Sequence, residues 1–435
     1  MAAARSCTNP CWSDLPADLL TSIVQLLELP GALAFASVCT SWRAAAGDIP
    51  HPRTPWLMSW EPDSRPAGGR SRSAVTCKFR NLLDVDRVYS LTFPEGTFVT
   101  CCGASNGWLV VVDELCNLSL HNPFTSQTIP LPPVTDFPCV MAAVHDEQGR
   151  TKAYRLSRSS GRYNDTRQYD AYHLATFFYW KAVLSGDPSG GGDYAVTVVH
   201  FGGRWISHVR AGDTRWRVLV ANKYIWGHCH PDAYADCAYH KGSVYAVTYQ
   251  GIVERWPLDD AGAGTPSKKQ QEEEVVQDRR LHDAVLARHL VVSPGGGGLW
   301  LVSAVWEPGR AEYPEAVRFT FGVVDDDDDA GGERERESVQ AHALFLGMNR
   351  PAWLPTGTGS FPGVKPGVLY FSAPWMRQYS PALLERVGDW GGARAYGALA
   401  KTRARTFERV FPGLLPESAR LMDCPTEVWV TPNLY

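Results

Sequence analysis

The sequence has little excess charge of either sign and no long hydrophobic run. Its 435 residues carry 42 Lys+Arg against 46 Asp+Glu, a formal net charge of -4, so a dominant basic surface for nucleic acid is not expected. No apolar run approaches the ~20 residues that span a bilayer, and residues 1–7 lack the apolar stretch of a secretory signal. The eleven cysteines are an odd number scattered through apolar segments, as expected of reduced thiols. Together these features predict a soluble intracellular protein of the cytoplasm or nucleus, with no membrane or nucleic-acid partner.

The overall composition favours a folded protein built mainly from strands. Hydrophobic residues make up 44% and charged residues 20%, which excludes wholesale disorder. The chain contains 39 Gly, 31 Pro, 16 Trp, 17 Tyr and 16 Phe, a mixture typical of many short strands separated by turns. The length allows one large domain or two to three ordinary ones.

The first fifty residues differ because they are rich in Leu and Ala with helical spacing. Pro16 suits the first turn of a helix, Pro30-Gly31 is expected to end that helix, and two shorter helices are expected before Gly47. Four apolar residues recur at every fourth position and predict one stripe along the first helix: Leu15, Leu19, Ile23 and Leu27.

A helical unit of about forty residues is small for independent stability. Leu20, Val24 and Leu26 widen the apolar surface of its first helix beyond one stripe. This width predicts a helix that packs on its own domain and also on a second surface.

The string from Leu15-Pro16 through Val38-Cys39-Thr40-Ser41-Trp42-Arg43 resembles an F-box. The resemblance implies a domain at residues 10–48, followed by a linker at 49–56, that docks on the Skp-family adaptor of a cullin-RING ubiquitin ligase. The alternative is a small helical bundle that packs only on the rest of the chain. Carried over position by position, the resemblance implies these adaptor-binding residues: Leu15, Pro16, Leu19, Leu20, Ile23, Leu27, Leu33, Val38, Cys39 and Trp42.

Beyond the linker the sequence repeats one arrangement, in which a glycine is followed by an apolar strand, a turn and a second strand. Clear copies begin at Gly107, Gly242 and Gly298, and another hairpin is expected from Asp193 to Arg210. The spacing fits repeats of about 40–50 residues, which predicts a β-propeller over residues 56–435. Six to eight blades are expected, with six or seven the best guess.

Several short motifs in this region resemble plant F-box proteins with a KIB-type β-propeller. They are Gly103 to Leu109, His121 to Phe124, Tyr239 to Val247, Ala343 to Gly347 and Val428 to Pro432. The resemblance runs from about Trp56 to Leu434, and it implies a mainly β fold of the propeller type after the small three-helix F-box.

Three segments depart from the repeated pattern. Residues 261–280 and 325–337 are charged and poor in aromatics, as expected of solvated loops inserted in the propeller. The run Asp325–Asp329 in the second loop could attract a basic partner, although self-repulsion in a loop explains it more simply. Residues 376–418 form an Ala/Arg-rich insertion that reads as helical.

The sequence offers only weak signals for chemistry. Residues 103–107 match the G-x-S-x-G string of hydrolases, but a strand rather than a helix is expected after them, so a hairpin explains the match. His228-Cys229-His230 with Cys237 and His240 does not complete a recognised zinc spacing. No phosphate loop or dinucleotide fingerprint occurs. We therefore predict no catalytic residue, cofactor or metal.

The combined prediction is a non-catalytic interaction protein. Its F-box would dock on the Skp adaptor and through it on cullin, and its propeller would present an unknown protein target to the ligase. One alternative is a propeller scaffold without ubiquitin transfer. Another is a propeller hydrolase, which would need Asp, Glu or His side chains that converge at the ends of inner strands.

Overall fold

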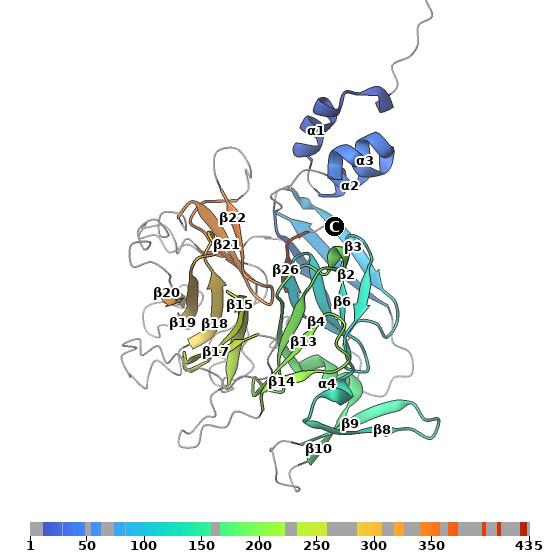
Figure 1. The fold of residues 1–435 in the computed structure, drawn as a ribbon, viewed down its shortest axis with the longest axis vertical. Helices are drawn as coiled ribbons and strands as arrows, with labels where there is room; N and C mark the ends of the chain where they lie inside the picture. Colours follow the sequence, from blue (N-terminus) through green and yellow to red (C-terminus); the bar gives the residue numbers. More distant parts are fainter. Residues whose placement is uncertain are drawn as a thin grey trace, which may run out of the picture. The chain divides into compact units, whose positions relative to one another are not determined.

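The chain forms two compact units in the computed structural model, residues Met1–Thr54 and Pro55–Tyr435 (Figure 1). Among the residues described, no helix has both the length and the apolar character needed to cross a membrane. The structure describes residues 12–27, 29–47, 54–61, 74–82, 84–157, 166–221, 233–258, 285–306, 317–325, 340–356, 364–372, 394–396, 407–409 and 427–432.

The N-terminal unit is helical, as predicted, but the first helix ends earlier than expected. Pro16 stands at the N-cap of α1 and Asp18 lies in its first turn, where a carboxylate favours the helix dipole. Pro30 and Gly31 do not end α1; they lie in the first turn of α2, where a proline costs no hydrogen bond. The elements are η1 Trp12–Asp14, α1 Ala17–Gln25, α2 Leu29–Val38 and α3 Thr40–Gly47.

The second unit is built almost entirely of strands arranged in seven sheets within the described residues. Within the described residues, all paired strands are antiparallel except β21 with β23. The strands are β1 Trp56–Ser59, β2 Val75–Asn81, β3 Asp84–Phe93, β4 Thr100–Ser105, β5 Trp108–Val112, β6 Leu118–His121, β7 Thr128–Pro130, β8 Val140–His145, β9 Thr151–Ser157, β10 Thr166–Asp170, β11 Tyr179–Leu184, β12 Ala195–His200, β13 Trp205–Arg210, β14 Arg217–Val220, β15 Tyr234–His240, β16 Ser243–Thr248, β17 Val253–Pro257, β18 Val285–Val292, β19 Leu299–Trp306, β20 Val317–Asp325, β21 His342–Leu346, β22 Ala352–Pro355, β23 Leu369–Phe371, β24 Arg394–Tyr396, β25 Phe407–Arg409 and β26 Glu427–Val430.

Six of the sheets contact one another in a closed ring. The sheets β26-β1-β2-β3, β4–β7, β11–β14, β15–β17 and β18–β20 meet in this order through strands β26, β4, β11, β15 and β18. The Trp300 and Trp353 rings, 6.3 Å apart, join the β18–β20 sheet to the β21–β25 sheet. Phe345 and Trp429, 5.1 Å apart, join that sheet back to β26. This ring is the β-propeller that the sequence predicts, and the number of blades in the whole chain stays a prediction.

The ring is closed by a strand from each end of this unit. Strand β26 pairs antiparallel with β1, with Trp56 opposite Val430 and Ser59 opposite Glu427. The motif at Val428 to Pro432 therefore contains the strand that closes the ring. Because the first and last sheet strands are hydrogen-bonded partners, the propeller has no free edge at this junction.

The innermost strands of neighbouring sheets approach very closely. A Cβ atom at Gly103 in β4 would lie 2.1 Å from the carbonyl oxygen of Ala182 in β11. Only glycine fits there without moving one of the two backbones. The glycine that begins the G-x-S-x-G string therefore has a packing role.

One sheet lies outside the ring. Strands β8, β9 and β10 form a separate three-stranded sheet that projects at the bottom of Figure 1 together with α4, Ala171–Phe177. Asp170 caps α4, since its carboxylate accepts a hydrogen bond from the backbone N–H of His173. The repeat pattern of the sequence did not predict this extra sheet, which is inserted in the chain between the second and third sheets of the ring.

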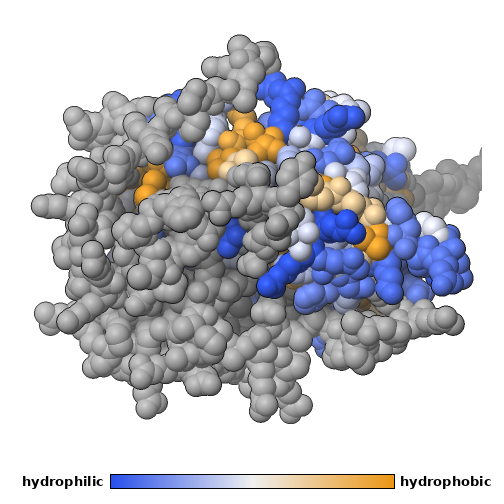
Figure 2. Space-filling model, turned by 90° about the horizontal axis from the view of Figure 1, so that it is seen from below, coloured by the Kyte–Doolittle hydropathy of each residue, from blue (hydrophilic) through white to orange (hydrophobic). Residues whose placement is uncertain are grey.

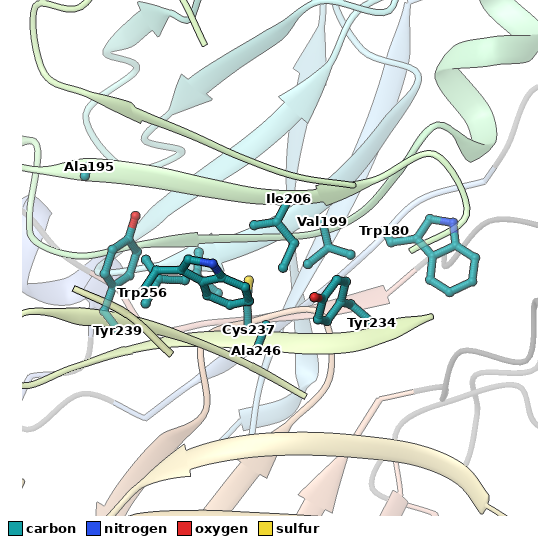
Figure 3. Packing of buried hydrophobic residues seen from close by; sticks show 11 residues of the cluster. Trp180, Ala195, Val199, Ile206, Tyr234, Cys237, Tyr239, Ala246 and Trp256 are labelled. Carbon is teal, nitrogen blue, oxygen red and sulfur yellow. The ribbon is translucent and has the colours of Figure 1, made fainter. Parts of the chain in front are cut away.

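Aromatic and aliphatic side chains fill the spaces between sheets. Figure 3 shows one such cluster, in which Trp180, Ile206, Tyr234 and Trp256 pack between the β11–β14 and β15–β17 sheets. The aromatics Trp108, Tyr245 and Trp300, which recur at equivalent positions of the sequence repeats, are 1%, 1% and 7% exposed and belong to the core.

The predicted hairpins are present as β5–β6, β12–β13, β16–β17 and β19–β20. The prediction of a helical insertion at 376–418 is wrong for its described residues, which form β24 and β25 and pair with each other. Residues 261–280 and 326–337 lie outside the described part of the chain. Asp325, the first of the five aspartates, ends β20, and its carboxylate accepts a hydrogen bond from the Tyr245 hydroxyl at 3.1 Å.

Candidate functional site

The N-terminal unit has a small core of its own. Leu20, Val24, Ala32 and Phe35 are at most 5% exposed and pack together from α1 and α2. Leu15, Leu27 and Trp42 pack against this core with part of their surface in solvent. Leu20, which the resemblance places among the adaptor contacts, is therefore a core residue that supports the surface from inside.

Trp42 ties α3 to the rest of the unit. Its ring lies 4.4 Å from that of Phe35 at an interplanar angle of 35°. Its indole N–H donates a hydrogen bond to the backbone carbonyl of Trp12 at 3.0 Å, which fixes the short helix η1 before α1. These contacts position the surrounding surface, and the indole itself is only partly open to solvent.

Large apolar side chains are exposed along one side of α1. Leu19 is 49% exposed, Ile23 38% and Leu26 87%, and their spacing of four and three residues places them in one row. Val38, at the end of α2, is 55% exposed. The helical unit supplies five of the ten large hydrophobics that are exposed among the described residues, although it is much the smaller of the two units.

The structure divides the predicted adaptor contacts into groups. The predicted apolar stripe along the first helix does not form one continuous face. Leu19 and Ile23 are exposed, whereas Leu15 and Leu27 pack on the core. The side chain of Leu33 lies outside the described residues. The remaining predicted contacts comprise exposed Pro16 and Val38 and partly buried Cys39 and Trp42.

Leu26 and Trp12 are exposed but absent from the predicted contacts. Leu26 lies seven residues after Leu19, which is about two helical turns. Helical periodicity in the sequence could therefore have placed Leu26 in the same row as Leu19. Trp12 is 74% exposed and comes before the F-box string that guided the prediction.

Charged side chains converge at the centre of the propeller. The Lys181 ammonium lies 3.3 Å from the Asp236 carboxylate, and it donates to the backbone carbonyls of Gly347 and Asn349 at 2.8 and 2.9 Å. The Asp236 carboxylate accepts the backbone N–H groups of Cys237 and Leu290 at 2.8 and 2.9 Å. Four of the six ring sheets meet in this network, which we call the central ion pair.

The central ion pair is fitted for a structural role. Burial raises the pKa of Asp236, but the Lys181 charge, the His289 ring 3.6 Å away and the hydrogen bond from the Leu290 backbone outweigh burial and lower it below the ordinary value. A carboxylate held ionised by a full set of partners is a weak proton acceptor. A propeller hydrolase requires charged side chains that converge at the ends of inner strands. The charged side chains that converge here are engaged in an internal ion pair.

The other weak chemical signals have local explanations. Ser105 ends β4, and Asn106 and Gly107, with φ of 52° and 82°, form the turn into β5, so the predicted hairpin at the G-x-S-x-G string is confirmed. His228, Cys229 and His230 lie outside the described residues. Within the described part no three His, Cys, Asp or Glu side chains gather as metal ligands.

A cavity of about 330 Å³ with a mixed polar and apolar lining opens where several inner strands end. It lies beside the β4–β5 turn, the loop after β11, the segment after β21 and the residues after β26. Sequence reasoning did not predict it, because its residues come from four distant segments. It is lined by Asn106, Ser185, Gly186, Asp187, Arg350, Thr431 and Pro432, and we call it the strand-end pocket.

The molecular surface seen in Figure 2 is mainly hydrophilic over its described residues. Hydrophobic residues on this face form separate patches. A partner that approaches the described residues of this face therefore meets mostly polar groups.

Comparison with known proteins identifies two domains in the chain. Residues 12–52 match the F-box domain, and residues 79–397 match the KIB1-4 beta-propeller. These matches confirm the resemblance that the sequence motifs indicate.

Similar proteins from Arabidopsis thaliana carry F-box names. Putative F-box protein At4g22660 is 32% identical over 29% of this chain and 32% of its own length. Putative F-box protein At4g22180 is 25% identical over 57% of this chain and 55% of its own. Probable F-box protein At4g22165 is 24% identical over 84% of this chain and 85% of its own. The chain thus spans between a third and about half of the first two relatives.

Proposed function

The chain belongs to the KIB1-4 β-propeller family and carries an F-box, and from this premise we propose that it is the substrate-recognition subunit of an SCF-type (Skp, cullin, F-box) E3 ubiquitin ligase. The observation that carries the proposal is the exposed apolar row Leu19, Ile23 and Leu26 on the F-box unit. Such a row is costly in water and is stabilised when a partner covers it.

In this role the F-box binds the Skp adaptor and the propeller binds a target protein. Leu19, Ile23 and Val38 supply the apolar contact area, while Leu20 and Trp42 hold the helices that present them. Joining the two functions in one chain raises the concentration of the target near the ubiquitin carrier. The chain makes and breaks no bond itself, and it works in the cytoplasm or nucleus where the ligase assembles.

The proposal is tested by the affinity of the full chain for a purified Skp-family adaptor, measured by calorimetry. Truncating two apolar anchors costs a few kcal/mol, so the double variant Leu19→Ala, Ile23→Ala should bind about 100-fold more weakly. Val88→Ala and Val323→Ala are matched controls, because these propeller residues are 42% and 46% exposed and should leave the affinity unchanged.

Three results would count against the proposal. A wild-type chain that is folded by circular dichroism and yet fails to bind the adaptor would overturn the ligase role. Binding that is unaffected by the double variant would remove the α1 row from the interface. Adaptor binding without recruitment of cullin would favour the scaffold alternative.

A further inference from the structure

The strand-end pocket contains a cation, Arg350, whose side chain has no partner among the residues that the structure describes. The backbone of Arg350 is fixed, since its N–H donates to the carbonyl of Ala104 at 2.7 Å and its carbonyl accepts the Asn349 side-chain amide at 2.8 Å. Among the described residues the Arg350 guanidinium has no hydrogen-bond or ion-pair partner. Burial lowers the pKa of Arg350 from its ordinary value, which means that the charge is partly removed from water.

A half-buried guanidinium that makes no ion pair or hydrogen bond is unfavourable unless a ligand supplies the acceptor oxygens. The five N–H donors of arginine form a planar fork that matches the two oxygens of a carboxylate or phosphate. The hydroxyl of Thr431 lines the same pocket and is also without a partner among the described residues, so it offers another donor.

The other polar groups of the pocket are already engaged and define its shape. The Asn106 amide donates to the Gly186 carbonyl at 2.8 Å. The Asp187 carboxylate accepts hydrogen bonds from the Trp108 indole at 3.2 Å and from the Ser189 backbone at 2.9 Å. Because these bonds join the β4–β5 turn to the loop after β11, the pocket wall is formed before a ligand arrives.

The charge of the pocket selects among anions. Asp187 lines the same pocket without pairing with Arg350, so it repels each negative charge of a ligand, and it opposes a dianion more strongly than a monoanion. A singly charged carboxylate is therefore favoured over a dianionic phosphate. The volume of about 330 Å³ lies at the small end of ligand sites and suits one acidic side chain and its neighbouring backbone.

We propose that the strand-end pocket binds the carboxylate of an Asp or Glu side chain in an acidic peptide segment, with Arg350 as the recognising cation. The identification of this segment as part of a ubiquitination target rests on the function proposed above. Carboxylate binding itself is independent of the F-box. Carboxylate binding can therefore fail while adaptor binding succeeds, and adaptor binding can fail while carboxylate binding succeeds.

The test uses the full-length chain and capped tripeptides followed by ligand-observed NMR titration. Acetyl-Gly-Glu-Gly-amide should bind at least tenfold more tightly than acetyl-Gly-Gln-Gly-amide, and Arg350→Met should abolish this difference. The matched control is Arg167→Met, since Arg167 is exposed on β10 outside the pocket and should not affect binding. Thermal unfolding of each variant establishes that the fold is retained.

The outcomes separate the proposal from its competitors. Equal affinity for the Glu and Gln peptides, or retention of the preference in folded Arg350→Met, would overturn it. If a phosphoserine peptide binds more tightly than the Glu peptide, the pocket is a phosphate site and the charge argument is wrong. If Arg350→Met does not fold, Arg350→Lys is used in its place. A loss of at least tenfold in the preference for the Glu peptide over the Gln peptide then supports recognition by the planar fork of arginine, and an unchanged preference contradicts it.

Discussion

Replacing Lys181 by Met should strongly destabilise the propeller. The substitution keeps much of the side-chain length but leaves the Asp236 carboxylate, which is 0% exposed, without its counter-charge. At the 3.3 Å separation, an effective dielectric constant of about 20 gives an attraction of about 5 kcal/mol. Breaking a buried pair typically costs about 3–5 kcal/mol, so we expect a loss in this range. The loss should shrink as the pH falls, because without Lys181 the pKa of Asp236 rises and protonation removes the unpaired charge.

The assay is urea unfolding of the full chain followed by tryptophan fluorescence and circular dichroism. Lys152→Met is the matched control, since Lys152 is exposed on β9 and should change stability by less than about 0.5 kcal/mol. The double variant Lys181→Met, Asp236→Asn should be more stable than the sum of the single losses predicts. A loss below about 1 kcal/mol in Lys181→Met would refute the view that the central ion pair holds the inner strands together.

Three further outcomes are expected. Gly103→Ala should lower stability by about 1–3 kcal/mol in urea unfolding, because the new methyl group meets the Ala182 carbonyl; an unchanged midpoint would contradict the close approach. Burial lowers the pKa of His200 to about 3 and that of His208 to about 4, so both rings are neutral in the folded protein. Their contribution to the stability of the fold is complete above pH 6.5 and is lost as the pH falls toward these values. The free energy of unfolding should thus be up to about 4 kcal/mol lower at pH 5 than at pH 7. His200→Gln should reduce this difference between the two pH values. Trp42→Ala should destabilise the helical unit by about 3 kcal/mol, visible as faster hydrogen exchange in α3, whereas unchanged exchange would place Trp42 outside the core.

The repeated hairpins and the helical N-terminus could be predicted because they depend on local pattern. The strand after Gly107 follows from its run of apolar residues, and the closing strand at 428–430 follows from its motif. The end of α1 was misplaced because Pro30 suits both the stop of one helix and the first turn of the next.

The candidate sites were less accessible to sequence reasoning. On α1, apolar residues occupy several faces, so the spacing alone did not separate buried Leu20 from exposed Leu19. The central ion pair and the strand-end pocket depend on ring closure, which brings Lys181, Asp236 and Arg350 to the inner strands from distant sheets. No local pattern contains that information.

The central claim is that the chain is the receptor subunit of a cullin-based ligase, and the most direct measurement is reconstitution. The purified chain is mixed with a Skp-family adaptor and a cullin, and the mixture is analysed by size-exclusion chromatography with light scattering. We predict one species whose mass contains one copy of each protein, and its loss in the Leu19→Ala, Ile23→Ala variant. A folded wild-type chain that elutes apart from the adaptor and cullin would contradict the account.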